Sequence, residues 1–152
     1  MNDPLAEIKN LRRVSTHLAT SGQPNESHLA TIAREGFEVV INLALHTDPR
    51  YSLRDEAGTV SRLGMAYIHI PVKFNRPTPG ELRLFFDAMD RNRNRKIWVH
   101  CAANMRVSAF MGLYWVRQDG QSHDKAFELM HSVWTPNELW TAFISKNLEP
   151  TN

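Results

Sequence analysis

The sequence has one cysteine, Cys101, among its 152 residues. A single cysteine cannot form a disulfide within the chain, so no internal cross-link stabilises the fold. No apolar run approaches the length of about 20 residues that a membrane-spanning helix needs. The first residues also lack the basic and then apolar pattern of a secretory signal. These absences favour a cytoplasmic protein that has no membrane partner.

The sequence also lacks a strong charge of either sign. Lysine and arginine number 18 against 16 aspartate and glutamate residues, which gives a formal net charge of +2. The densest basic run, residues 91–96, contains no aromatic residue that could stack on a nucleic acid base, so we interpret it as a solvated helix end. No nucleic acid partner is expected, and the mild positive charge suits a small anionic substrate.

Length and patterning favour one α/β domain covering residues 1–152. Segments typical of strands alternate with segments of helical periodicity. Strands are expected at residues 14–20, 37–43, 66–70 and 97–99. Helices are expected after Asn25, at 55–63, after Thr78, at 107–119, at 123–132 and after a capping box at Thr135–Glu138. This order predicts a mostly parallel, four- or five-stranded sheet flanked by helices, with ligands bound beyond the carboxyl ends of its strands.

Cys101 lies at such a strand end, where a short loop connects the strand to an apolar helix. The positive end of a helix dipole favours an anion and favours a thiolate over a thiol. Arg106 supplies a fork of N–H donors suited to an oxyanion. We therefore predict that a phosphate is held by Arg106 and by the loop amides, while the sulfur attacks phosphorus. The loop residues in this prediction are Ala102, Ala103, Asn104 and Met105.

The stretch from His100 and Cys101 through Arg106 to Ser108 resembles the signature of the cysteine-based protein tyrosine and dual-specificity phosphatases. Three further segments resemble small bacterial dual-specificity-like phosphatases, and together they extend the resemblance over roughly residues 14–145. These segments are Ser21–Pro24, Val39–Leu43 and His69–Val72.

The resemblance implies a dual-specificity phosphatase fold and hydrolysis of a phosphomonoester. Cys101 is then the nucleophile that forms a phosphocysteine intermediate, Arg106 binds the phosphate, and His100 and Ser108 support the loop. The implied partner is a phosphorylated protein or a small phosphorylated molecule, with phosphate or sulfate bound in the loop.

The spacing between cysteine and arginine departs from the family pattern. Four residues separate Cys101 from Arg106, whereas the family has five. Either a tighter loop keeps Arg106 in its role, or Val107 takes the place of the arginine and Ser108 keeps the place of the family hydroxyl. We favour the tighter loop, because a valine against a bound dianion contributes nothing to binding.

The family also has an aspartate after the preceding strand, which protonates the leaving oxygen. Residues 73–76 of this chain are Lys, Phe, Asn and Arg, none of which is a carboxylic acid. Asp48, Asp55 and Glu56 lie in another loop-rich segment, and we interpret them as ordinary surface carboxylates because no spacing singles one out. The sequence therefore predicts a slow phosphatase, or one limited to substrates with good leaving groups.

Three other interpretations remain open for Cys101. A gap of four residues between cysteine and arginine also occurs in rhodanese-like sulfurtransferases, whose loop stabilises a cysteine persulfide. A pseudophosphatase would keep the anion site without turnover. A cysteine at a strand end can also serve packing alone.

No cofactor is expected, and no metal. The sequence has seven histidines but no pair spaced for a metal site on a helix, and no carboxylate cluster with ligand spacing. Three of the tryptophans are interpreted as core and interhelix packing rather than as a ligand platform. These are Trp115, Trp134 and Trp140.

Overall fold

The computed structural model describes residues 3–49 and 52–149, and its centre is a five-stranded sheet. The strand order is β1-β2-β5-β3-β4, in which β1 is antiparallel to β2 and the other neighbours are parallel. The expected mostly parallel sheet is therefore confirmed. The strands are β1 (Arg12–Arg13), β2 (Leu18–Ser21), β3 (Val39–Asn42), β4 (Ala66–His69) and β5 (Ile97–His100).

The first expected strand, residues 14–20, is divided in the structure. The backbone N–H groups of Val14 and Ser15 both donate to the Leu18 carbonyl, which closes a tight turn between β1 and β2. This turn makes β1 a short antiparallel edge strand. Since β1 is only two residues long, it offers little unpaired backbone to another chain.

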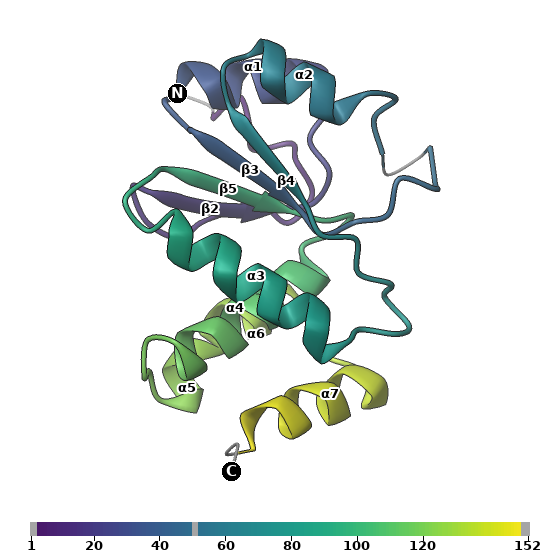
Figure 1. Ribbon diagram of the computed structural model, residues 1–152, viewed down its shortest axis with the longest axis vertical. Helices are drawn as coiled ribbons and strands as arrows, with labels where there is room; N and C mark the ends of the chain where they lie inside the picture. Colours follow the sequence, from purple (N-terminus) through teal and green to yellow (C-terminus); the bar gives the residue numbers. More distant parts are fainter. Residues whose placement is uncertain (1–2, 50–51, 150–152) are drawn as a thin grey trace.

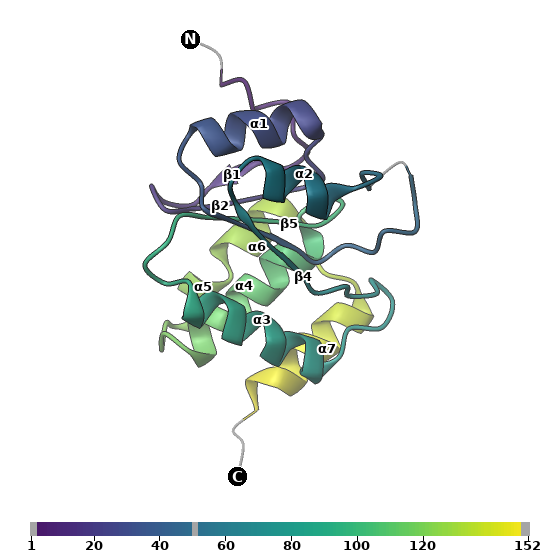
Figure 2. The ribbon, with the colours of Figure 1, turned by 45° about the horizontal axis from the view of Figure 1, so that its top comes forward.

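Helices cover both faces of the sheet, as the alternating sequence pattern predicts. α1 and α2 lie on one face, and α3 to α7 lie on the other (Figures 1 and 2). None of the helices in the described part of the chain is long and apolar enough to cross a membrane. The helices are α1 (Glu26–Arg34), α2 (Glu56–Arg62), α3 (Pro79–Arg91), α4 (Met105–Arg117), α5 (His123–Ala126), α6 (Glu128–Val133) and α7 (Glu138–Leu148).

Two expected helix details near the C-terminus are wrong. The single helix predicted at 123–132 is broken at Phe127, whose ring packs directly on Gly112 of α4. The predicted capping box at Thr135–Glu138 does not form, because Asn137 accepts from the Trp140 N–H and is the N-cap of α7. Asn25 and Thr78 cap α1 and α3 as expected.

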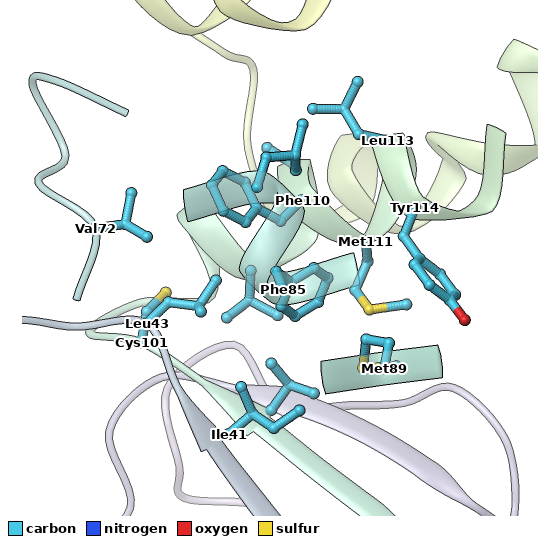
Figure 3. Close-up of a cluster of buried hydrophobic side chains, with 14 of the residues drawn as sticks. Ile41, Leu43, Val72, Phe85, Met89, Cys101, Phe110, Met111, Leu113 and Tyr114 are labelled. Atoms are coloured by element: carbon cyan, nitrogen blue, oxygen red, sulfur yellow. The ribbon is translucent and has the colours of Figure 1, made fainter. Parts of the chain in front are cut away.

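Alternate residues of the central strands enter two separate apolar clusters. Val39 and Ile41 of β3 pack with α3 to α7, whereas Val40 packs with Trp98 against α1, α2 and the N-terminal segment. Figure 3 shows the first of these clusters. The same alternation sends consecutive residues at the end of β5 to opposite faces of the sheet. The His100 side chain therefore points toward α2, and the Cys101 side chain points into the first cluster.

Candidate active site

Cys101 follows β5 directly, beyond the carboxyl ends of the parallel strands. Its side chain is 1% exposed and belongs to the first apolar cluster together with Leu43 and Val72 (Figure 3). The backbone N–H of Cys101 donates to the Ser21 carbonyl at the end of β2. The sheet therefore holds the thiol at the bottom of the loop, at the edge of the core.

The N-terminus of α4 is open behind this loop. The N-cap residue of α4 is Asn104, which has a left-handed backbone (φ 65°) and makes no side-chain bond to the helix. The N-cap side chains of α1, α2, α3, α5 and α7 all make such a bond. The first N–H groups of a helix have no partner within the helix. In α4 no N-cap side chain competes for them, so an oxyanion can.

Arg106 occupies the first turn of α4 and is 9% exposed. Its Nη1 donates to the Val72 carbonyl at 2.7 Å, which links α4 to the segment that follows β4. Val107 is fully buried in the apolar cluster and does not line the loop. The Ser108 hydroxyl donates to the Met105 carbonyl at 3.1 Å. Arg106 thus supplies the cationic group of this turn, and its guanidinium is held by the Val72 carbonyl.

A buried ion pair supports the loop from the other face of the sheet. His100 Nε2 lies 2.6 Å from Glu56 Oε2, and both side chains are completely buried. Gln23 Nε2 donates to the second carboxylate oxygen of Glu56 at 2.8 Å. Burial raises the pKa of Glu56, but the charge of His100 and the hydrogen bonds from His100 and Gln23 outweigh it and hold this pKa below its usual value. Glu56 is therefore an ionised buried carboxylate.

The interpretation of Glu56 as a surface carboxylate is wrong. Glu56 lies one turn before the buried Val60 on α2, so the two residues share the face that packs on the sheet. That spacing is the sequence signal that identifies Glu56 as buried. Its pairing makes it unsuitable as the missing general acid, because it has no exposed oxygen to give a proton to a leaving group.

His100 also contacts the loop itself. Its Nδ1 lies 3.3 Å from the Cys101 carbonyl oxygen. A carbonyl and a carboxylate only accept hydrogen bonds, so both contacts of the ring call for an N–H. His100 thereby connects α2 to the backbone of Cys101.

Two histidines, His46 and His69, lie together where β3 and β4 end. His46 Nε2 is 3.1 Å from both Asn42 Nδ2 and the Tyr67 hydroxyl, and its ring stacks on His69 with centroids 4.2 Å apart. Desolvation lowers the pKa of His46, and the neighbouring His69 lowers it further. A neutral ring has one acceptor nitrogen, so His46 Nε2 can accept from Asn42 Nδ2 or from the Tyr67 hydroxyl. Across residues 3–49 and 52–149, no three histidine, cysteine, aspartate or glutamate side chains form a group that could hold a metal ion.

The segment after β4 is anchored by the C-terminal helix. Trp140 Nε1 donates to the Phe74 carbonyl at 2.7 Å, and the Phe74 ring packs on Trp134 and Trp140. Trp140 is fully buried, and Trp115 and Trp134 pack against the same cluster. The packing role predicted for these tryptophans is confirmed.

Residues 6–138 match the protein family described as "DSP-PTPase phosphatase fused to NAD+ Kinase". The chain belongs to this family of cysteine-based, dual-specificity-like phosphatases. No curated protein sequence matches the chain. A DUF442 protein from Shewanella putrefaciens CN-32, described as a candidate phosphatase, is 30% identical and superposes with a TM-score of 0.82, covering 94% of this chain and 93% of its own.

Two more distant structures share the fold. TpbA of P. aeruginosa, in complex with pTyr, is 20% identical with a TM-score of 0.66, and the match covers 86% of this chain and 75% of TpbA. PTPMT1, in complex with PI(5)P, is 14% identical with a TM-score of 0.75, and the match covers 90% of this chain and 93% of PTPMT1. Both confirm the predicted dual-specificity phosphatase architecture.

Proposed function

We propose that this protein is a cysteine-dependent phosphatase that hydrolyses phosphomonoesters through a phosphocysteine intermediate. The observation that carries the proposal is the position of Cys101 directly before the uncapped N-terminus of α4, with Arg106 in the first turn. Family membership supports the same chemistry. In this proposal the Cys101 thiolate, the open amides of α4 and the Arg106 guanidinium act together on a phosphate dianion.

In the first step, the Cys101 thiolate attacks phosphorus, the bond from phosphorus to the ester oxygen breaks, and this oxygen leaves with the electron pair. Water then attacks phosphocysteine and releases inorganic phosphate and the thiolate. The amides after Cys101 and the guanidinium of Arg106 stabilise the charge that spreads over the phosphoryl oxygens. Arg106 uses one N–H for Val72, so its other N–H groups remain for phosphate.

Protonation of the leaving oxygen limits this reaction. Residues 73–76 contain no carboxylic acid, and Glu56 is buried in its pair with His100. A general acid contributes about 10²-fold to 10⁴-fold to a rate. The proposed enzyme is therefore slow, and it is selective for esters whose leaving oxygen is stable without a proton.

The proposed substrate is a phosphorylated protein or a small phosphorylated molecule, with phosphate or sulfate as a ligand of the loop. Support comes from TpbA and PTPMT1, which share the fold and were crystallised with pTyr and PI(5)P. Steady-state assays with p-nitrophenyl phosphate and glycerol 2-phosphate test the proposal. We expect hydrolysis of the aryl ester, inhibition by inorganic phosphate, and a kcat/KM at least about 100-fold lower for the alkyl ester. Equal hydrolysis of both esters contradicts the inference that the enzyme lacks a general acid. Hydrolysis of neither ester contradicts the proposed phosphatase function.

A further inference from the structure

Two asparagines have an unusual backbone, and they face each other across the loop. Among the described residues, Asn10 (φ 52°) and Asn104 (φ 65°) are the non-glycine residues with positive φ. Asparagine tolerates this left-handed conformation better than most residues, but it still costs free energy. Two such residues at one place indicate that the surrounding contacts hold them there.

Hydrogen bonds in both directions join Asn10 to the loop at Ala103 and Asn104. Asn10 Nδ2 donates to the carbonyl of Ala103, the residue before Asn104, at 2.9 Å. Asn104 Nδ2 donates in return to the Asn10 carbonyl at 2.8 Å and to Thr20 Oγ1 at 2.9 Å. Asn104 and Thr20 are completely buried. The N-terminal segment is therefore bonded to the loop at two successive residues.

These bonds account for the open N-terminus of α4. An asparagine at an N-cap ordinarily turns its side chain toward the helix and accepts from the second or third N–H. The Asn104 side chain is instead committed to Asn10 and Thr20, and it makes no cap bond. The Asn10 main-chain carbonyl and the Thr20 hydroxyl thus hold the Asn104 side chain away from the amides that the anion needs.

Asn10 is itself held in place by the core. Leu5 and Ile8 are 0% and 3% exposed and pack in the second apolar cluster. The carbonyl of Lys9 accepts from the Gly22 N–H at 2.7 Å. The residues before Asn10 are thereby fixed to the core and to the turn after β2.

We propose that Asn10 is a positioning residue for the anion-binding loop. It acts through Asn104 and Ala103 and does not touch the phosphate. This role rests on the proposed phosphatase function, because it concerns the affinity of the same loop for phosphate. Asn10 lies 91 positions before Cys101 and outside the segments that resemble the phosphatase signature.

The test uses Asn10→Gly, which keeps the left-handed backbone without strain and keeps the carbonyl that accepts from Asn104. The variant removes only the side-chain donor to Ala103, so it tests that bond. Asn94→Gly is the control, because Asn94 is exposed and precedes the amino-terminal end of β5, whereas the loop follows its carboxyl end. We expect amide hydrogen exchange over residues 101–107 to rise about tenfold, and the inhibition constant for inorganic phosphate to rise by about the same factor. Exchange in β3 and the melting temperature stay close to wild type, which separates positioning from general destabilisation.

Asn10→Asp gives a second variant if the glycine variant folds poorly, since aspartate keeps the shape but cannot donate to a carbonyl when it is ionised. Unchanged exchange over 101–107 in the folded variants overturns the role of Asn10, whether or not the protein hydrolyses phosphate esters. The role of Asn10 is also overturned if the wild type is active and both variants have the same inhibition constant for phosphate as the wild type. A wild type without hydrolysis or phosphate binding overturns the proposed function instead, and the exchange result then still decides whether Asn10 orders the loop.

Discussion

The side chains of Glu56 and His100 lie 2.6 Å apart, and neither is exposed to solvent. Alternation along β5 directs His100 toward α2, while the next residue, Cys101, enters the apolar cluster on the other face. The buried charge of Glu56 is thereby satisfied on the opposite face of the sheet from Cys101. An isolated charge at this depth would be strongly unfavourable, so each of the two side chains depends on the other.

Removal of the Glu56 carboxylate is expected to destabilise the protein strongly. Glu56→Ala leaves His100 and Gln23 without their buried acceptor, and such a loss costs about 3–5 kcal/mol. Glu56→Gln keeps an acceptor oxygen and should cost less. Urea unfolding measures both variants, with Asp87→Asn as the control because Asp87 is an exposed carboxylate on α3. A Glu56→Ala cost no larger than that of the control contradicts a functioning buried pair.

The same pair predicts how stability depends on pH. The pKa of Glu56 is lower in the folded protein than its ordinary value, so the folded state binds fewer protons at this site than the unfolded chain. The ionised Glu56 carboxylate therefore makes its full contribution to the unfolding free energy above the ordinary glutamate pKa of about 4.3. This contribution is lost as the pH falls through the lower pKa of Glu56 in the folded protein. The wild type should lose more unfolding free energy than Glu56→Gln between about pH 6 and about pH 3. Parallel pH curves for the two proteins are the contrary result.

Access to Cys101 is expected to depend on the anchor at Trp140. Trp140→Phe keeps an aromatic ring in the core but removes the hydrogen bond to the Phe74 carbonyl, which lies two residues after Val72. The segment from Val72 to Phe74, whose Val72 packs in the same cluster as Cys101, should then move more freely. Alkylation of the Cys101 thiol by iodoacetamide should become faster. Trp115→Phe is the control, since Trp115 is half-buried and packs on the same cluster. Equal alkylation rates in the two variants would show that the anchor does not govern access.

Close contact between the turn after β2 and the loop predicts that a side chain at Gly22 destabilises the protein. A Cβ atom at Gly22 would lie 2.5 Å from the Ala102 carbonyl oxygen and 3.0 Å from that of Lys9. Both oxygens belong to the backbone, so Gly22→Ala must displace the loop and should cost about 1–3 kcal/mol. Phosphate inhibition should weaken with it. Gly80→Ala is the control, because the nearest atoms to its Cβ are 3.9 Å away; similar losses in both would contradict the contact.

Most of the fold could be predicted from the sequence, because it depends on local periodicity. The apolar runs in β3 and β5, the caps Asn25 and Thr78, and the left-handed Gly64 that ends α2 are each visible within a few residues. The break at Phe127 was missed, since it depends on a contact with Gly112 of another helix.

The site could be predicted only where its residues lie close together in the sequence. Cys101 and Arg106 are five positions apart, and the strand and helix around them reveal the loop. Helix periodicity can place Glu56 on the buried face of α2, but it does not identify His100 as the partner, 44 positions away. The contact between Asn104 and Asn10, 94 positions apart, likewise leaves no local signal. These distant residues decide the charge behind the loop and the orientation of its amides.

Hydrolysis of p-nitrophenyl phosphate by Cys101→Ser tests the central claim most directly. The phosphocysteine route predicts that turnover falls by more than about 1,000-fold, because serine at this position has no base to activate it. Inorganic phosphate should still bind to the variant, since the amides of α4 and Arg106 remain. Turnover within tenfold of the wild type would contradict the account, because the reaction would then not proceed through the sulfur of Cys101.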